Sequence, residues 1–259
     1  MEKELKEMRK TMLKTSAIGK DGNLQSCFSS LEIIWTLYTY FMPSSQEEWA
    51  SKDRNRFVLS KGQSNLALMT VLAKRGFISN DELSTFCQFD SRISMQADRT
   101  KFDPFVETSA GSLGHGLPMA VGLAWGKRIK NEYGRIFCLA GDGEMNEGTM
   151  WEALMFAASE KLNNIVLIID NNHSIQKMID IGDFTQKIVS FGWDCCSVDG
   201  HNINELKEAL CKQTSKPLAI LATTIRGWGS KTLMDDRSWF HRYPKQNELN
   251  SLLAEVDEF

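Results

Sequence analysis

The sequence lacks the features that mark fibrous, disordered, membrane-spanning and nucleic-acid-binding proteins. With 5 proline and 18 glycine residues in 259, it is neither collagen-like nor a low-complexity chain. No apolar run is long enough, at about 18 residues, for a helix that crosses a bilayer. The 30 basic and 33 acidic residues nearly cancel and form no long block of one sign. A nucleic acid or an anionic membrane therefore has no electrostatic support as a partner.

Cysteine pairs with redox or metal-site spacing are also missing. None of the six cysteines forms a Cys-x-x-Cys motif, and adjacent Cys195 and Cys196 are poorly placed for an ordinary disulfide. The N-terminal segment MEKELKEMRK is charged from its start and lacks the apolar core of a signal peptide. We therefore expect reduced, mostly buried thiols and a cytoplasmic location.

Strand and helix patterns alternate along the chain. Strands that are apolar without alternation, separated by helices, indicate a parallel sheet covered on both faces. We predict an α/β fold, a single doubly wound parallel sheet in one domain over residues 1–259. The predicted strands are residues 54–60, 135–140, 164–170, 193–198 and 217–224. The predicted helices are residues 4–18, 30–42, 64–75, 81–88 (opened by Asn80 as N-cap), 113–131, 147–161 and 203–213, with a long loop at 91–110.

Polar clusters follow two of the apolar strands. Asp142, between two glycines, comes directly after strand 135–140, and Asn172 follows strand 164–170, 30 residues later. That separation fits one strand–helix–strand crossover, so both oxygens can reach one ion if the strands are neighbours. Carboxylate and amide oxygens suit Mg²⁺ (or Ca²⁺), with water and a phosphate completing the shell. The next helix points its N-terminus here, so the pattern predicts a metal–diphosphate site, the alternative being two surface turns.

Taken together, this GDG and NN pattern is the signature of thiamine diphosphate (ThDP) enzymes, and the chain resembles the transketolase family. The resemblance runs from about residue 12 to 255 and corresponds to the diphosphate-binding (PP) domain. Its clearest stretches are DRNRFVLSKG (53–62), VETSAGSLGHGLPMAVGLAWGKR (106–128), the segment 141–172, FGWDCCSVDGHN (191–202), IRGWG (225–229) and SWFH (238–241).

The resemblance implies that a second chain completes the enzyme. Members of the family carry a pyrimidine-binding domain and a C-terminal domain after the PP domain, whereas this sequence stops at Phe259. The pyrimidine domain supplies the glutamate that activates the aminopyrimidine ring of ThDP. We therefore expect this chain to be the PP subunit of a split enzyme, with a pyrimidine-domain partner in an α₂β₂ heterotetramer.

The resemblance also assigns residues to roles. Asp142, Asn172 and the backbone carbonyl of Ser174 match the family's metal ligands. Glu147 matches the glutamate that couples two sites across the subunit interface. The positions that match cofactor-binding residues are Gly111, Leu113, Gly141, Asp142, Gly143, Glu144, Asn172 and His241. The other histidines, His115, His173 and His201, are interpreted as non-catalytic.

Three family histidines of the substrate channel are replaced by amides. Asn23, Gln63 and Gln96 stand at these positions. Asn and Gln keep hydrogen-bonding atoms but do not titrate near neutral pH, so they cannot act as general bases. We hypothesise that the cofactor binds but the donor differs, a 2-oxo acid such as pyruvate transferred to a carbonyl acceptor. The alternatives are ordinary ketose-to-aldose two-carbon transfer and a non-catalytic scaffold subunit.

Overall fold

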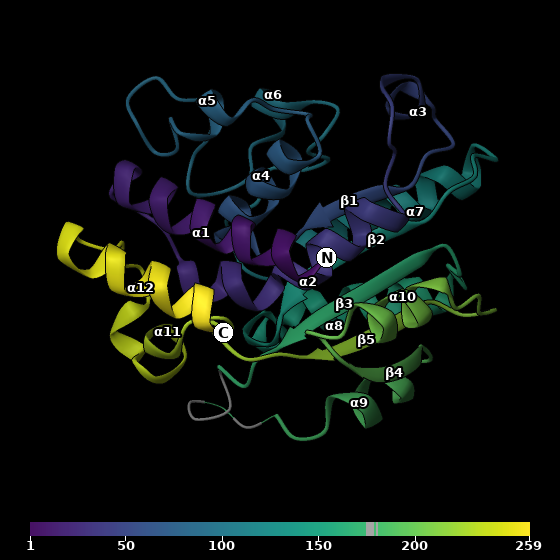
Figure 1. Ribbon diagram of the computed structural model, residues 1–259. Helices are drawn as coiled ribbons and strands as arrows, with labels where there is room; N and C mark the ends of the chain where they lie inside the picture. Colours follow the sequence, from purple (N-terminus) through teal and green to yellow (C-terminus); the bar gives the residue numbers. More distant parts are fainter. Residues whose placement is uncertain (175–178, 180) are drawn as a thin grey trace.

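The computed structural model describes residues 1–174, 179 and 181–259 and contains a five-stranded sheet (Figure 1). All pairings are parallel, in the order β1-β2-β3-β5-β4. The predicted α/β fold with a parallel sheet is therefore confirmed. The strands are β1 (Arg56–Leu59), β2 (Ile136–Gly141), β3 (Ile165–Asn171), β4 (Asp194–Asp199) and β5 (Leu218–Thr223).

Helices cover both faces of the sheet, because successive strand residues point to opposite sides. Phe137 and Leu139 of β2 belong to an apolar cluster that includes residues of α1, α2, α4, α10 and α12, whereas Cys138 belongs to a second cluster with residues of α7, α8 and α9. The C-terminal helix α12, yellow in Figure 1, lies along α1. These helices are α1 (Glu2–Gly19), α2 (Leu24–Tyr40), α4 (Asn65–Lys74), α7 (Gly116–Ile129), α8 (Gly148–Ser159), α9 (Phe184–Ser190), α10 (Ile203–Cys211) and α12 (Gln246–Glu258).

Several short helices lie in the connections. They are α3 (Gln46–Ala50), η1 (Gly62–Ser64), α5 (Asn80–Leu83), α6 (Arg99–Phe102), η2 (Asp142–Asn146), α11 (Lys231–Asp235) and η3 (Arg237–Trp239). None of the helices in the described part of the chain is long and apolar enough to span a membrane.

Four local predictions need correction. The helix predicted over 81–88 is the single turn α5, and Ser79 rather than Asn80 caps it by accepting the Glu82 N–H at 3.0 Å. The helix predicted over 30–42 begins at residue 24 and is buried along most of its length. The loop predicted over 91–110 contains α6. Strand β4 is half exposed because it forms an edge of the sheet, not a buried interior strand.

The register of β2 and β3 positions the two polar clusters of the sequence. Gly141 is the residue of β2 that pairs with Asp170 of β3, so Asp142 and Asn172 leave the same edge of the sheet on adjacent strands. The strand adjacency on which the predicted metal site depends is thus present.

Candidate cofactor-binding site

The side chains of Asp142 and Asn172 converge on Ser174. The Ser174 N–H donates to Asp142 Oδ2 at 2.8 Å and lies 3.2 Å from Asn172 Oδ1. The Ser174 hydroxyl donates to Asp142 Oδ1 at 2.7 Å. Because a carboxylate oxygen and an amide oxygen already face one positively polarised hydrogen, they are placed to face one cation. This donor set fits a hard divalent metal such as Mg²⁺.

The described part of the chain contains no group of three His, Cys, Asp or Glu side chains that could hold a metal. The predicted third ligand is a backbone carbonyl, that of Ser174, which remains a prediction. In this structure Ser174 presents its N–H and hydroxyl to Asp142.

Most of the predicted cofactor residues line one cleft of about 280 Å³ at the ends of β2 and β3. Predicted residues along it are Gln63, Leu113, Gly141, Asp142, Gly143, Glu144, Asn172 and Ser174. Ser26 near the start of the chain and Arg226 and Phe240 near its end also line the cleft. The cleft therefore joins segments that are more than 200 residues apart in the sequence.

The buried carboxylate of Glu144 accepts hydrogen bonds from three segments that border the cleft. Its Oε1 accepts the Gly141 N–H at 3.1 Å, and its Oε2 accepts the Gly114 N–H at 2.9 Å and the Ser60 hydroxyl. Burial raises the pKa of this carboxyl above its ordinary value, although the three hydrogen bonds act in the opposite direction. Glu144 thus holds the ends of two strands and the loop before α7 together.

Lys61 is a site residue that sequence reasoning missed. Its side chain is 2 % exposed, forms an ion pair with fully buried Asp170, and donates to Ser29 Oγ at 3.0 Å. Asp170 also accepts the hydroxyls of Ser29 and Thr224. The ammonium of Lys61 neutralises Asp170 beneath the cleft, and the Lys61 stem packs beside Gly141. The one sequence feature that could have pointed to Lys61 is its position in the turn that follows the buried strand β1.

Arg226 is a second cation at the cleft that sequence reasoning gave no role. Its guanidinium donates to Gln25 Oε1 at 2.8 Å and lies 5.5 Å from the centre of the Phe240 ring. Gln25 in turn donates to the carbonyls of Leu233 and Asp236 at 2.6 and 3.1 Å. Arg226 also borders an adjoining pocket of about 350 Å³, together with Asn172 and Ser174. A guanidinium and a metal site at one cleft are suited to a diphosphate.

The model of the transketolase thiamine diphosphate binding domain matches residues 6–249 of the chain. The chain belongs to this family. It is 34% identical over 250 residues to human transketolase, a match that covers 93% of the chain and 39% of that protein. The chain therefore spans about two fifths of the length of the curated transketolases that it matches.

A shorter relative matches along its whole length. The chain is 30% identical over 271 residues to an apulose-4-phosphate transketolase subunit of Actinobacillus succinogenes, covering 100% of the chain and 96% of that protein. Among solved structures, transketolase from Leishmania mexicana superposes with a TM-score of 0.86 at 26% identity, over 99% of the chain and 41% of that chain. Fold and family are thus established, and the chain carries the family's thiamine diphosphate binding domain.

The three amides predicted to lie in the substrate channel lie differently from one another. Gln63 lines the cleft. Asn23 caps α2, because its Oδ1 accepts the Ser26 N–H at 3.3 Å. Its Nδ2 is buried and finds no hydrogen-bond acceptor in the described chain. Gln96 Oε1 is likewise buried without a donor, close to Gly62 and Gly111.

The capping bond gives a physical reason for asparagine at position 23. Asn is among the best N-cap residues, whereas histidine is not. The cap also fixes the amide orientation, because Oδ1 must face the N–H and Nδ2 is then a donor. Asn23 therefore has a structural role at the start of α2, and its role in the substrate channel stays a prediction.

The remaining predicted residues lie around the cleft. Gly111 and Leu113 are exposed on the loop before α7, and Glu147 is exposed at the start of α8. His241 is exposed and does not line the cleft, but its ring packs edge-on against Phe240, which does. His115 and His173 are exposed. The His201 side chain, by contrast, is only 8 % exposed.

Proposed function

We propose that this chain is the diphosphate-binding subunit of a two-subunit ThDP-dependent enzyme that transfers a carbon unit to a carbonyl acceptor. The observation that carries the proposal is the convergence of Asp142 and Asn172 on Ser174, beside the guanidinium of Arg226. A catalytically silent scaffold would have no use for this combination.

The donor set assigns a part of the cofactor to each residue. Asp142, Asn172 and Ser174 would hold Mg²⁺, and the Gly143 N–H and Arg226 would hold the diphosphate. When bound, ThDP supplies an electron sink for the carbon–carbon bond change. The chain's own residues bind and orient the cofactor and neutralise its charge.

An exposed apolar surface on α7 and α8 supports assembly with other chains. Trp125 and Phe156 are 40% and 42% exposed. Their rings pack edge to face, with 5.6 Å between the ring centres. Ile129 and Met155 are more than half exposed on the same two helices, and Glu147 lies at the start of α8. Apolar patches of this kind mark protein interfaces. We place a contact between PP subunits here, within an α₂β₂ assembly whose pyrimidine-domain partner supplies the activating glutamate.

A 2-oxo acid such as pyruvate is the proposed donor. The amides at positions 23, 63 and 96 can orient a carbonyl group but cannot remove a proton from a donor hydroxyl near neutral pH. Decarboxylation would need no such proton. With ThDP bound as the electron sink, the bond to the carboxylate would break and CO₂ would leave, and the electron pair would form the new bond to the acceptor carbonyl, whose oxygen would take up a proton. Ketose-to-aldose transfer is the second candidate, because the relative that matches over its whole length is named as part of a transketolase.

The test is to co-express the chain with its pyrimidine-domain partner and to supply ThDP and Mg²⁺ with one of two donors. Release of ¹³CO₂ from carboxyl-labelled pyruvate, coupled to an aldehyde acceptor, supports the 2-oxo acid. Two-carbon transfer from xylulose 5-phosphate to an aldose instead would establish the ordinary transketolase reaction. Absence of any ThDP binding by the pair would contradict the enzyme assignment and favour a scaffold. The matched control is Asp142→Asn, which should be inactive with either donor.

A further inference from the structure

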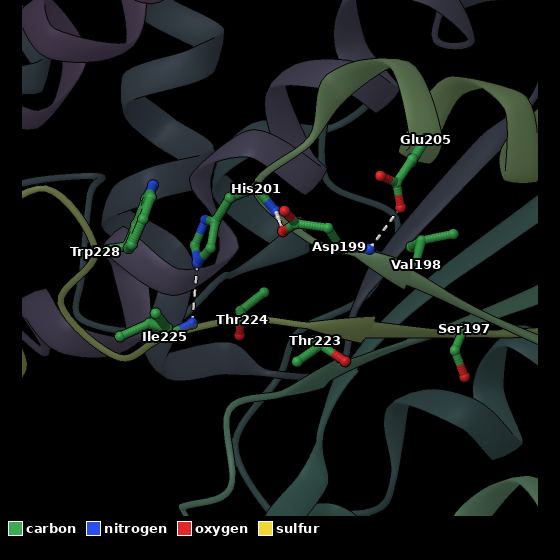
Figure 2. Close-up of a pocket in the computed structure, with 9 residues that line it drawn as sticks. All are labelled: Ser197, Val198, Asp199, His201, Glu205, Thr223, Thr224, Ile225 and Trp228. Atoms are coloured by element: carbon green, nitrogen blue, oxygen red, sulfur yellow. Dashed lines mark hydrogen bonds between the residues drawn. The ribbon is translucent and has the colours of Figure 1, made fainter.

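His201 contacts the segment 225–228, which carries Arg226, through a hydrogen bond and a ring contact. Figure 2 shows the imidazole of His201 directed at Ile225, with the Trp228 ring beside it. The Ile225 N–H donates to His201 Nε2 at 2.9 Å, and the His201 and Trp228 rings stack at 4.5 Å with 18° between their planes. His201 therefore contacts the residues on both sides of the Arg226–Gly227 step.

The hydrogen bond from Ile225 determines the state of the imidazole. A backbone N–H is only a donor, so Nε2 must be the unprotonated nitrogen and Nδ1 carries the hydrogen. That hydrogen is directed at Glu32 Oε2, 3.3 Å from Nδ1. His201 thus bridges the buried carboxylate of Glu32 on α2 and the backbone N–H of Ile225.

Glu32 is itself fixed by Arg9 of α1. Burial alone would raise the pKa of Glu32, but the charge of Arg9 and the bond from His201 outweigh it and hold the pKa below its ordinary value. Arg9 Nε also donates to the Trp228 carbonyl at 2.8 Å. Gly229 has a φ of 106°, and a Cβ there would lie 2.5 Å from Arg9 Nε. Residues 225 and 228 are therefore both tied to one Glu32-centred cluster.

These ties matter because space lies on both sides of the segment. A cavity of about 500 Å³ is lined by His201, Thr224, Ile225 and Trp228 (Figure 2). Thr224 and Ile225 also border the 350 Å³ pocket that opens next to Asn172 and Arg226. Residues 224–225 thus separate the two pockets. Without the contacts to His201 and Arg9, the segment 225–228 has room to shift away from the cleft.

We propose that His201 is a positioning residue that holds Arg226 toward the diphosphate of the cofactor. The inference rests on the proposed function, because it takes Arg226 as a diphosphate ligand. Histidine suits this position since its two nitrogens bridge a carboxylate on one side and a backbone donor on the other. His201 is accordingly more than a turn residue.

Two amide variants separate the two bonds of the imidazole. In His201→Gln the amide reaches as far as Nε2 and can accept from Ile225. In His201→Asn it reaches only as far as Nδ1, so the bond to Glu32 can persist but the bond to Ile225 is lost. Both variants are tested in the complex with the pyrimidine-domain partner, with Mg²⁺ and inorganic pyrophosphate, by calorimetric titration, and their thermal midpoints are recorded.

We expect His201→Asn to weaken pyrophosphate binding on the order of tenfold, the effect of one hydrogen bond that orients a charged ligand, and His201→Gln to restore most of it. In an Arg226→Gln background, His201→Asn should cause no further loss, because it acts through Arg226. A purely structural role would lower the thermal midpoint while leaving the two losses additive.

Each other outcome is decisive. A wild-type complex that fails to bind pyrophosphate contradicts the proposed function itself. Wild-type binding with an unchanged affinity in His201→Asn, or additive losses with Arg226→Gln, overturns only the positioning role. If His201→Asn does not fold, His201→Phe takes its place, since it keeps a flat ring against Trp228 and also lacks the acceptor.

Discussion

The two ends of the proposed active site differ in how their polar atoms are satisfied. At the metal and diphosphate end, both carboxylate oxygens of Asp142 and of Glu144 accept hydrogen bonds. At the substrate end, Asn23 Nδ2 and Gln96 Oε1 are buried and unpaired in the described chain. A buried polar atom without a partner costs about 1–3 kcal/mol. The two carboxylates are thus held in place by the chain itself, whereas the two amide atoms are left to pair with a substrate or with another protein chain.

The largest effect is expected where the cofactor end is most buried. Lys61→Met leaves Asp170 as a buried carboxylate without its cation, which should lower the free energy of unfolding by about 3–5 kcal/mol. The double variant Lys61→Met, Asp170→Asn should recover much of this loss, because no charge is then left unpaired. Urea unfolding measures both. Equal losses in the single and double variants would show that the charge pair is not the cause.

Removal of the metal carboxylate should affect binding rather than folding. Asp142→Ala deletes the anionic ligand, and we expect ThDP affinity in Mg²⁺ to fall by about 100-fold, the upper range for a group that governs metal affinity. Isothermal titration with and without Mg²⁺ is the measurement. Glu208→Gln, an exposed carboxylate on α10, is the control and should bind as wild type does. An Asp142→Ala protein that keeps its Mg²⁺-dependent affinity would remove the metal from this position.

A smaller effect is expected at the substrate end, from the cap of α2. Asn23→Ala removes the oxygen that accepts the Ser26 N–H and should cost about 1 kcal/mol of stability. Asn23→Ser keeps a capping oxygen and deletes the unpaired Nδ2, so it should be at least as stable as wild type. Denaturant titrations of the two variants decide the matter. If Ala and Ser are equivalent, asparagine is not retained there for capping.

The smallest effect concerns the pH dependence contributed by Glu144. Its folded-state pKa is raised by burial, so its contribution to stability is fully present below the unfolded pKa of 4.5 and is lost as the pH rises through the folded value. The stability difference between wild type and Glu144→Gln should therefore move against wild type as the pH rises above 4.5. Urea midpoints from pH 4 to 8 measure it. A difference that moves in favour of wild type would show that the hydrogen bonds dominate.

The sequence predicted those parts of the molecule that local patterns determine. Apolar runs located the five strands, and the cluster around Asp142 followed from its position after a buried strand. The edge position of β4 could not be predicted in this way, because it depends on the β3-to-β4 crossover that passes β5. Helices α9 and α12 were not predicted.

Three residues could not be assigned from local pattern because tertiary contacts give them their roles. Lys61 becomes significant only when Asp170, 109 residues away, is brought beneath it. Arg226 reaches the cleft because the segment around it folds back over α2 and contacts Gln25. His201 lies in a turn, but its ring is buried between Glu32 of α2 and the Trp228 ring.

The central claim is that this chain's own residues at the ends of β2 and β3 hold the metal–diphosphate. The most direct measurement is a diffraction experiment on the chain with ThDP, using Mn²⁺ in place of Mg²⁺ and its anomalous signal to locate the ion. We expect one anomalous peak within coordination distance of Asp142 and Asn172, with the diphosphate next to Arg226. A peak elsewhere, or a diphosphate bound away from this cleft, would contradict it.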